Sequence, residues 1–372
     1  MRVLIPTVDY PPIEGGISTV ALQVSRALSR QGHDVTVVAP SFPDMDEFDA
    51  AEPVRVVRYS GYNIGWLRLF PLLRSAWPFV KDTDKILAIN VAYGGMLGRL
   101  AHLRYRTRYI NFAYAYEFLK FASNPFAKMV LRSIYRSGQH CIAISRFTRD
   151  NLIEFGVDEE NIRVVLPGAS PAKVISENSM AQARHKLDLH DGPVILAVGR
   201  FIPRKGHISL VEALPSVHER VGGAQLVMIG RGPERERCQN KARALGVEGD
   251  VCCPGYVDDD TLQALYATCT CFALPTGEDE QGHVEGFGLV FTEAHAHGKP
   301  VVAGRSGGVV DAVLSGETGI LVPPRNTEEL VTALCRLLEQ PAYAERLGEA
   351  GRDRVERTLN WDRFTEQLFE ND

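Results

Sequence analysis

Residues 285–308 read EGFGLVFTEAHAHGKPVVAGRSGG, which is a glycine-containing loop, then an apolar run, then a strand-like segment. The apolar run is closed by Gly298 and Pro300, so it predicts a short helix that follows the loop directly. The first turn of a helix presents unpaired backbone N–H groups and a partial positive charge, which suits a phosphate. The residues expected at this junction are Gly286, Phe287, Gly288 and Leu289.

Two carboxylates frame the junction, Glu285 before it and Glu293 within the apolar run. If the whole segment were helical, eight residues would separate them by roughly 12 Å. That is too far for both to act on one bond, as paired glycosidase carboxylates do. We therefore expect them to hold different parts of one long ligand. A nucleotide-sugar fits, with one carboxylate on sugar hydroxyls, the other on ribose hydroxyls and the diphosphate between them.

The rest of the chain alternates strand and helix patterns. Residues 3–7, 17–29 and 35–39 read as strand, helix and strand, with Gly15 and Gly16 where the first strand gives way to its helix. Open parallel sheets bind ligands at this position, although a tight turn alone also explains the two glycines. The second half repeats the alternation, which predicts a second doubly wound sheet. Its expected strands are 194–200, 225–230, 251–257, 271–275, 300–304 and 319–322.

A cationic loop, GRFIPRKG at residues 199–206, follows the first strand of the second half. It lies at the carboxyl end of that strand, where such sheets bind ligands, although a surface loop with incidental cations would read the same way. A dinucleotide site is disfavoured because no G-x-G-x-x-G occurs and the second strand ends in Ala39-Pro40 rather than an acid. No G-x-x-x-x-G-K-[ST] motif occurs either, which argues against a simple phosphotransferase.

Length and composition favour an ordinary globular protein of about two domains, with 372 residues, 45% of them hydrophobic and 23% charged. The seven cysteines include no C-x-x-C pair, which predicts a reducing compartment, and we expect a cytoplasmic protein. The N-terminus is too soon interrupted for a signal peptide, and no run reaches the roughly 18 apolar residues of a spanning helix.

The E-x7-E pattern of Glu285 and Glu293, with the surrounding GFGLV, PVVAG and the Ser-Gly-Gly turn at 306–308, resembles family 4 of the retaining glycosyltransferases. This resemblance implies the α/β GT-B fold, in which two Rossmann-like doubly wound domains face a central cleft. We expect an acceptor-side domain at residues 1–170, a nucleotide-sugar-binding domain at 171–355, and a C-terminal helix at 356–372 that crosses back to the first domain.

The resemblance also implies roles for individual residues. Arg200 and Lys205 would hold the donor diphosphate, Glu285 would orient the sugar and stabilise its developing charge, and Glu293 would anchor the ribose. The implied enzyme is a retaining, metal-independent hexosyltransferase that uses no cofactor. GRFIPRKG resembles the phosphatidylinositol mannoside mannosyltransferases, which favours GDP-mannose and a glycan, glycolipid or lipid-linked acceptor. A UDP-sugar donor with a soluble acceptor, and a non-catalytic nucleotide-sugar-binding protein, are the alternatives.

One family feature is replaced in this sequence. A histidine commonly follows the strand that corresponds to INFAYAYE, residues 110–117, and here Tyr114 or its neighbour Ala115 takes that position. An adjacent phenol can supply one hydrogen bond to the donor sugar, so we include Tyr114 among the expected substrate-binding residues.

Charge is distributed unevenly. Residues 60–149 contain fourteen Lys and Arg against three acids, a net charge of +11 in a chain whose total is −5. Segment 66–81, WLRLFPLLRSAWPFVK, spaces cations among aromatic and aliphatic bulk, and Pro71 and Pro78 are expected to prevent one long helix there. This pattern indicates peripheral contact with an anionic membrane, or else a solvated basic face and a docking helix. Nucleic-acid binding is disfavoured because no recognised module accompanies the charge.

Two clusters invite a metal-site interpretation. Asp258, Asp259 and Asp260 precede a helical pattern and are expected to be its N-cap and first-turn charges. His283 lies beside three acids in what we expect to be a solvated loop, and His295 and His297 lack further soft ligands. We therefore predict no metal site. Lys128, Arg132 and Arg136 recur every four residues and should share one helix face.

Overall fold

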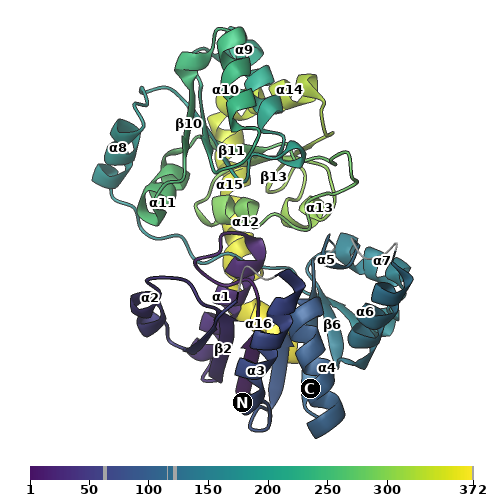
Figure 1. Ribbon diagram of the computed structural model, residues 1–372. Coiled ribbons are helices and arrows are strands. Elements are labelled where there is room, and N and C mark those ends of the chain that lie inside the picture. Colours follow the sequence, from purple (N-terminus) through teal and green to yellow (C-terminus); the bar gives the residue numbers. More distant parts are fainter. Residues whose placement is uncertain (62–64, 115, 120–123, 371–372) are drawn as a thin grey trace. The chain divides into compact units, whose positions relative to one another are not determined.

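The computed structural model describes residues 1–61, 65–114, 116–119 and 124–370, and it divides into two compact units. Unit 1 comprises residues 1–167 and 361–372, and unit 2 comprises residues 168–360 (Figure 1). The domain limits predicted from the sequence are residues 170 and 355, and the two compact units divide after residues 167 and 360. Both chain ends belong to unit 1.

Within the described residues, unit 1 is built on a seven-stranded parallel sheet in the order β3-β2-β1-β4-β5-β6-β7. The order runs outward in both directions from the β1–β4 pair, so the loops after these two strands diverge and leave room for a ligand between them. The strands are β1 Arg2–Pro6, β2 Asp34–Pro40, β3 Arg55–Tyr59, β4 Lys85–Ala88, β5 Arg108–Ala113, β6 His140–Ala143 and β7 Ile162–Val164.

Helices connect these strands, because parallel neighbours need crossover connections. A one-turn π-helix, η2 (Val91–Gly95), joins β4 to its helix and brings Gly94 so close to Pro6 that a side chain would not fit. The α-helices of unit 1 are α1 Gly16–Arg30, α2 Asp46–Ala51, α3 Leu69–Val80, α4 Met96–Tyr105, α5 Tyr116–Leu119, α6 Pro125–Ser137, α7 Arg146–Phe155 and α16 Trp361–Phe369. Its 3₁₀ turns are η1 Gly65–Arg68 and η3 Glu159–Asn161.

The expectation for segment 66–81 was wrong. Pro71 and Pro78 do not interrupt a helix, because α3 runs continuously from Leu69 to Val80 after the short turn η1. Pro71 lies in the first turn, where backbone N–H groups have no intrahelical partner to lose. Pro78 lies in the last turn, and the burial of one apolar face holds the helix together around it. The buried residues of α3 are Leu72, Ala76 and Val80.

Unit 2 is built on a six-stranded parallel sheet in the order β10-β9-β8-β11-β12-β13, and its switch point lies between β8 and β11. Every residue of β9 and β11 is buried, as expected for strands covered on both faces. The strands are β8 Val194–Val198, β9 Gln225–Ile229, β10 Val251–Gly255, β11 Cys271–Leu274, β12 Val301–Gly304 and β13 Gly319–Val322. The prediction of two doubly wound parallel sheets is confirmed.

The helices of unit 2 cover both faces of its sheet (Figure 1). On one side α9 packs against α10 and α14, while α12 packs against α15 and α11 packs against α8. These α-helices are α8 Glu177–Lys186, α9 His207–Val221, α10 Arg235–Ala244, α11 Asp259–Thr268, α12 Leu289–Ala296, α13 Val309–Ala312, α14 Thr327–Glu339 and α15 Pro341–Arg357. The 3₁₀ turns are η4 Pro203–Lys205 and η5 Glu248–Asp250.

The last helix, α16, packs on unit 1. The Phe364 ring lies 6.1 Å from that of Phe112 in β5, and Arg30 of α1 pairs with Asp362 at 2.7 Å. At the other end of α16, the Nε2 atom of His140 lies 3.1 Å from the carbonyl oxygen of Leu368. The helix is therefore attached to both α1 and the sheet.

Candidate functional site

The cationic loop after β8 reaches across to β11. Its 3₁₀ turn η4 ends at Gly206, whose φ of +74° favours glycine and whose α-carbon lies so close to Pro275 that a Cβ would meet the Pro275 carbonyl oxygen at 2.3 Å. The backbone N–H of Phe201 donates to Arg231 at 2.9 Å, which ties the beginning of the loop to the end of β9. Lys205 is thereby placed at the switch point of the sheet.

At the switch point, the Nζ atom of Lys205 lies 2.7 Å from Oε2 of Glu285, and their side chains are only 11% and 16% exposed. The two residues are eighty positions apart in the sequence but follow the neighbouring strands β8 and β11. Burial alone would raise the pKa of the Glu285 carboxyl, but Lys205, with Arg204 and Arg200 nearby, holds that pKa below its ordinary value. Glu285 is therefore an ionised carboxylate in a cationic surrounding.

The loop from Glu285 to α12 is fixed from both sides. The Glu285 carbonyl oxygen accepts from the N–H of Gly308 at 2.8 Å, and a Cβ on Gly307 would meet that same oxygen at 2.3 Å. Phe287 is buried, and Gly288 is the N-cap of α12 with a φ of +92°. A Cβ on Gly288 would lie 3.5 Å from Cγ of Glu285, so α12, which begins at Leu289, starts next to the Glu285 side chain.

Glu293 lies within α12. Its Oε2 accepts a hydrogen bond of 2.9 Å from the phenol of Tyr266, a residue of α11. Burial raises the pKa of the Glu293 carboxyl, and the Tyr266 hydrogen bond and the charge of Lys205 oppose that rise. The two carboxylates of the sequence motif thus have different partners, a lysine for Glu285 and a phenol for Glu293.

The candidate residues of unit 1 lie at its own switch-point edge. Gly15 is the N-cap of α1 with a φ of +142°, and no atom would contact a Cβ built on it, so the loop offers open space. Gly16 begins the helix. Tyr114 follows β5 directly and is half-buried, while Ala115 lies outside the described residues.

The chain is similar to known proteins over nearly its whole length. Over 378 aligned residues the chain is 31% identical to the GDP-mannose-dependent alpha-(1-6)-phosphatidylinositol monomannoside mannosyltransferase of Mycobacterium tuberculosis, a match that covers 99% of this chain and 97% of that protein. The chain is a family 4 glycosyltransferase. The family profile "Glycosyltransferase Family 4" matches residues 14–173 of this glycosyltransferase, and "Glycosyl transferases group 1" matches residues 179–354.

Further relatives of the glycosyltransferase support the same assignment. The Mycolicibacterium smegmatis protein of the same name is 32% identical over 94% of this chain and 92% of its own length. Among solved structures, Anabaena HepE with UDP and glucose has a TM-score of 0.81 at 19% identity, covering 99% of this chain and 98% of that one. A sucrose-phosphate synthase from Thermosynechococcus elongatus has a TM-score of 0.79 at 24% identity, covering 99% and 97%. These two confirm the GT-B fold.

Some polar residues of this glycosyltransferase were missed by the sequence analysis. Asn90, after β4, accepts from Thr7 at 2.9 Å and donates to Asp9 at 2.8 Å, so a polar network joins the ends of β1 and β4 in unit 1. In unit 2, Tyr266 bonds Glu293. Arg204 was predicted as a cation of the loop after β8 but without a role, and it contributes to the field at Glu285. For Asn90 and Arg204 the available signal was a polar side chain in the loop after a strand, which becomes informative once the strand order is known. Tyr266 lies within α11 and gave no such signal.

The acidic and histidine residues that we did not expect to bind a metal have other partners in the glycosyltransferase. Asp258 is the N-cap of α11 and accepts from the N–H of Thr261 at 2.8 Å, as expected. His283 pairs with Asp279 at 3.1 Å, and His295 bonds the Thr318 carbonyl at 2.9 Å. Across the described parts of the chain, no group of three or more His, Cys, Asp and Glu is arranged to hold a metal ion.

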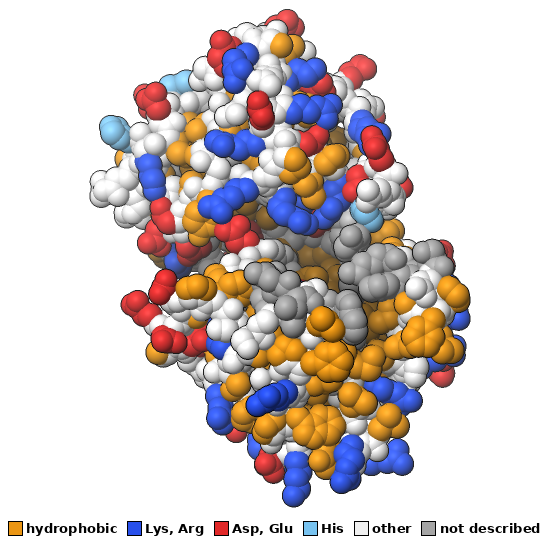
Figure 2. All heavy atoms as spheres, in the orientation of Figure 1, with side chains coloured by type: hydrophobic (Ala, Val, Ile, Leu, Met, Phe, Trp, Pro, Cys, Tyr) orange, Lys and Arg blue, Asp and Glu red, His pale blue; other side chains and the backbone are white. Residues whose placement is uncertain are grey.

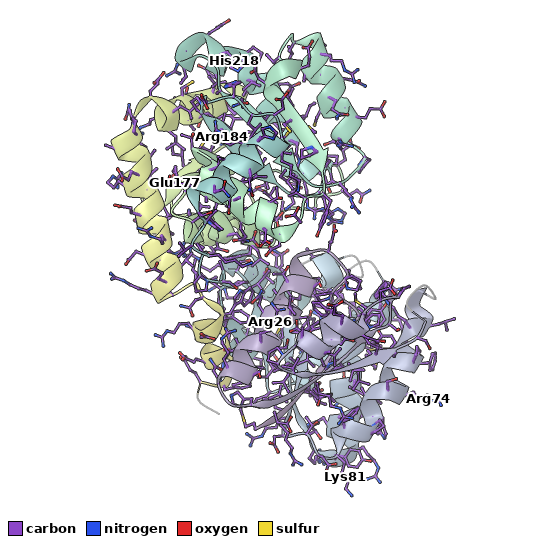
Figure 3. The ribbon with its side chains drawn as sticks, turned by 90° about the vertical axis from the view of Figure 1, so that its left-hand side faces the viewer. Arg26, Arg74, Lys81, Glu177, Arg184 and His218 are labelled. Atoms are coloured by element: carbon purple, nitrogen blue, oxygen red, sulfur yellow. The ribbon has the colours of Figure 1, made fainter. Side chains whose placement is uncertain are left out.

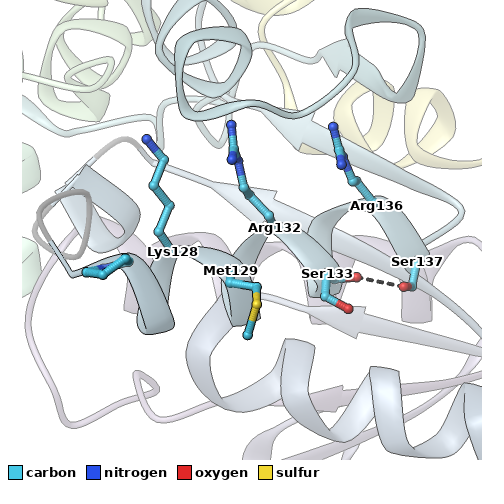
Figure 4. A pocket seen from close by; sticks show the side chains of 7 residues that line it. Lys128, Met129, Arg132, Ser133, Arg136 and Ser137 are labelled. Carbon is cyan, nitrogen blue, oxygen red and sulfur yellow. Dashed lines mark hydrogen bonds between the residues drawn. The ribbon is translucent and has the colours of Figure 1, made fainter.

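The three cations of α6 do share one face, and they line a hollow of about 570 Å³ (Figure 4). Arg132 donates to the carbonyl of Phe155 at 2.5 Å, Lys128 lies 5.4 Å from the Phe155 ring centre, and Arg136 pairs with Asp158 at 3.2 Å. These contacts place two of the cations at the C-terminal end of α7, where positive charge stabilises the helix dipole. This face of the glycosyltransferase therefore has a structural role.

Proposed function

We propose that the enzyme transfers mannose from GDP-mannose to a lipid-linked acceptor, with retention of anomeric configuration and without a metal ion. The observation that carries this proposal is the buried contact between Lys205 and Glu285 at the switch point of unit 2, with Arg200 and Arg204 around it. The preference for GDP-mannose and a glycolipid acceptor is supported by the names of the mycobacterial relatives.

The leaving diphosphate needs its developing charge stabilised. As the bond between the anomeric carbon and the phosphate oxygen breaks, Arg200, Lys205 and the first N–H groups of α12 provide that stabilisation from fixed positions. The ammonium of Lys205 has three N–H donors, so it can hold Glu285 and a phosphate oxygen at the same time. These cations can thus do the work that a metal ion does in other transferases.

Retention follows if the acceptor attacks from the face that the diphosphate leaves. The acceptor oxygen forms the new bond to the anomeric carbon while its proton passes to an oxygen of the departing phosphate. Glu285, ionised, orients the sugar hydroxyls and stabilises positive charge on the sugar, and Glu293 accepts from the ribose hydroxyls. In unit 1, Gly15, Gly16 and Tyr114 are proposed to contact the substrates.

We further propose that unit 1 meets the acceptor at an anionic membrane surface on the cytoplasmic side. Orange side chains gather over α3 and α4 in Figure 2, and Arg74 and Lys81 project from α3 and its end in Figure 3. Within the described residues, no helix has the length and apolar character to cross a bilayer. The large apolar side chains exposed on η1, α3 and α4 are Leu67, Phe70, Trp77, Leu100, Leu103 and Tyr105.

A panel of donors tests the proposed function. GDP-mannose, GDP-glucose, UDP-glucose and UDP-galactose are compared by thermal shift and by slow hydrolysis, and the product anomer is assigned by nuclear magnetic resonance. GDP-mannose should raise the melting temperature most, since ligand binding stabilises the folded state, and should release α-mannose. Selection of UDP-glucose would favour a soluble acceptor instead. Binding without turnover of any donor, even with a lipid acceptor, would favour a nucleotide-sugar-binding protein.

Chelation provides a separate prediction. Because Arg200 and Lys205 supply the charge stabilisation, mannosyl transfer should continue at an unchanged rate in excess EDTA. The rate is measured with radiolabelled GDP-mannose before and after dialysis against the chelator. Loss of activity that Mg²⁺ or Mn²⁺ restores would contradict the metal-independent mechanism.

A further inference from the structure

The carboxylate of Glu293 accepts a hydrogen bond from a buried phenol. Tyr266, in the last turn of α11, is 1% exposed, and its Oη atom donates to Oε2 of Glu293 at 2.9 Å. We infer that Tyr266 is a positioning residue for nucleotide binding, which acts by fixing the Glu293 carboxylate in the orientation that receives the ribose hydroxyls. This inference rests on the ribose-binding role proposed above for Glu293.

The phenol is itself locked in place by two parallel rings. The ring of His297 lies 5.4 Å from that of Tyr266 at an interplanar angle of 12°, and the ring of Phe272 in β11 lies 5.9 Å away at 28°. Nε2 of His297 is 2.9 Å from Oε1 of Gln263, which precedes Tyr266 by nearly one turn of α11. Gln263, His297, Tyr266 and Glu293 therefore form one chain of contacts between α11 and α12.

This chain has a defined direction of hydrogen bonding. Burial lowers the pKa of His297 to about 4, so the ring is neutral and its Nε2–H donates to the Gln263 amide oxygen. Burial also raises the pKa of the Tyr266 phenol well above its ordinary value, which keeps the phenol a donor. With Oε2 of Glu293 fixed by that donor, Oε1 is the oxygen left for a ligand.

The phenol also favours the ionised form of Glu293. Burial and the charge of Asp259 at the start of α11 raise the pKa of this carboxyl, while the Tyr266 hydrogen bond and Lys205 lower it. His297 and Cys269 are the other titratable groups in contact with Tyr266. His297 is neutral above about pH 4, and burial raises the pKa of the Cys269 thiol to about 12, so neither changes its charge between pH 5 and pH 8. Removing the phenol should therefore raise the pH at which Glu293 takes up a proton and stops accepting hydrogen bonds.

The test is Tyr266→Phe in the full chain, with binding of free GDP measured by calorimetry between pH 5 and pH 8. Affinity should fall about tenfold, equivalent to about 1.4 kcal/mol, and the decline of affinity at low pH should begin at higher pH than in wild type. With GDP-mannose the loss should appear in KM more than in kcat, because the ribose contact is made before and after the sugar leaves. Tyr109→Phe is the matched control, since it removes a buried phenol that donates to a backbone carbonyl in unit 1.

A double-mutant cycle with Glu293→Gln separates positioning from packing. If Tyr266 acts through the carboxylate, Tyr266→Phe should add little to the effect of Glu293→Gln. If Glu293→Gln weakens GDP binding but Tyr266→Phe keeps the affinity and pH profile of wild type, or behaves like Tyr109→Phe, the inference is wrong and the proposed function stands. If Glu293→Gln and Glu293→Ala both bind GDP as wild type does, the ribose assignment itself fails.

Discussion

Lys205 is the residue on which the proposed chemistry depends most. It is a buried cation whose partner, Glu285, lies in the loop between the neighbouring strand β11 and α12. We propose that this is where the diphosphate leaves. A cation on the surface of unit 2 contributes little by comparison, because exposed ion pairs are screened by solvent. Position within the sheet, rather than charge alone, separates this lysine from the others.

Lys205→Ala should therefore lower kcat by about 10²–10³-fold, the usual loss when one fixed donor to a transition-state charge is removed. Turnover of GDP-mannose is measured together with far-ultraviolet circular dichroism. Lys241→Ala is the matched control, because Lys241 pairs with Glu212 at 2.9 Å with both side chains partly exposed, and it should keep wild-type turnover. Near-normal turnover in a folded Lys205→Ala variant would overturn the diphosphate assignment.

Residue spacing in the sequence predicted only part of the candidate site. The interval between Glu285 and Glu293, and the cations of the loop after β8, were readable because each lies in one short stretch. The network of Thr7, Asp9 and Asn90 was not, since more than eighty residues separate its ends and only the β1–β4 pairing brings them together. Tyr266 was missed because its partner, Glu293, lies on another helix, and only the packing of α11 and α12 brings the two side chains together.

At the scale of elements, the strands and helices followed from periodicity, but α3 did not. A proline in the first turn of a helix loses no hydrogen bond, and one in the last turn disturbs only the end of the helix. Pro71 and Pro78 occupy those turns of α3, so sequence rules that treat every internal proline as a break give the wrong result here. The apolar face of the helix, which the sequence did display, determined the outcome.

The exposed face of α3 and α4 supports a prediction about membranes. The protein should sediment with vesicles containing anionic lipid at low salt and less at high salt, because each cation near such a surface contributes about 1 kcal/mol that screening reduces. Phe70→Ser and Leu103→Ser, which change side chains 60% and 59% exposed, should each weaken that binding. Leu245→Ser, at a 40% exposed position in unit 2, should not. Equal sedimentation with neutral vesicles, or none with either, would contradict the proposal.

At the scale of the whole molecule, the chain forms two compact units, each built on a sheet of its own. The second half of the sequence repeats the pattern of the first, so the division into two sheets was readable from it. The assignment of the last helix depends on long-range packing, because Phe364 contacts Phe112 and Arg30 pairs with Asp362 across more than two hundred residues.

Phe364→Ala should destabilise unit 1 by about 3–5 kcal/mol, the range for removing a buried aromatic side chain. Hydrogen exchange measures this locally, and the amides of β1 and β5 should lose protection while those of β8 and β9 keep theirs. Phe126→Ala, at a side chain 71% exposed on α6, is the control and should change protection within about 0.5 kcal/mol. Equal loss of protection in both units would show that α16 does not belong to unit 1 alone.

The two ends of unit 2 are joined by backbone contacts. The N–H of Ala169 donates to Leu359 at 2.8 Å, and Ala169 forms a parallel bridge with Asn360, so the first and last residues of unit 2 lie side by side. In topological terms, unit 2 is an insertion between the seventh strand and the final helix of its host. Domains whose ends meet in this way tolerate transplantation. A short linker between residues 167 and 361 should therefore be enough to join the two parts of unit 1 when unit 2 is removed. By the same argument, residues 168–360 could be inserted into a loop of another protein as one domain.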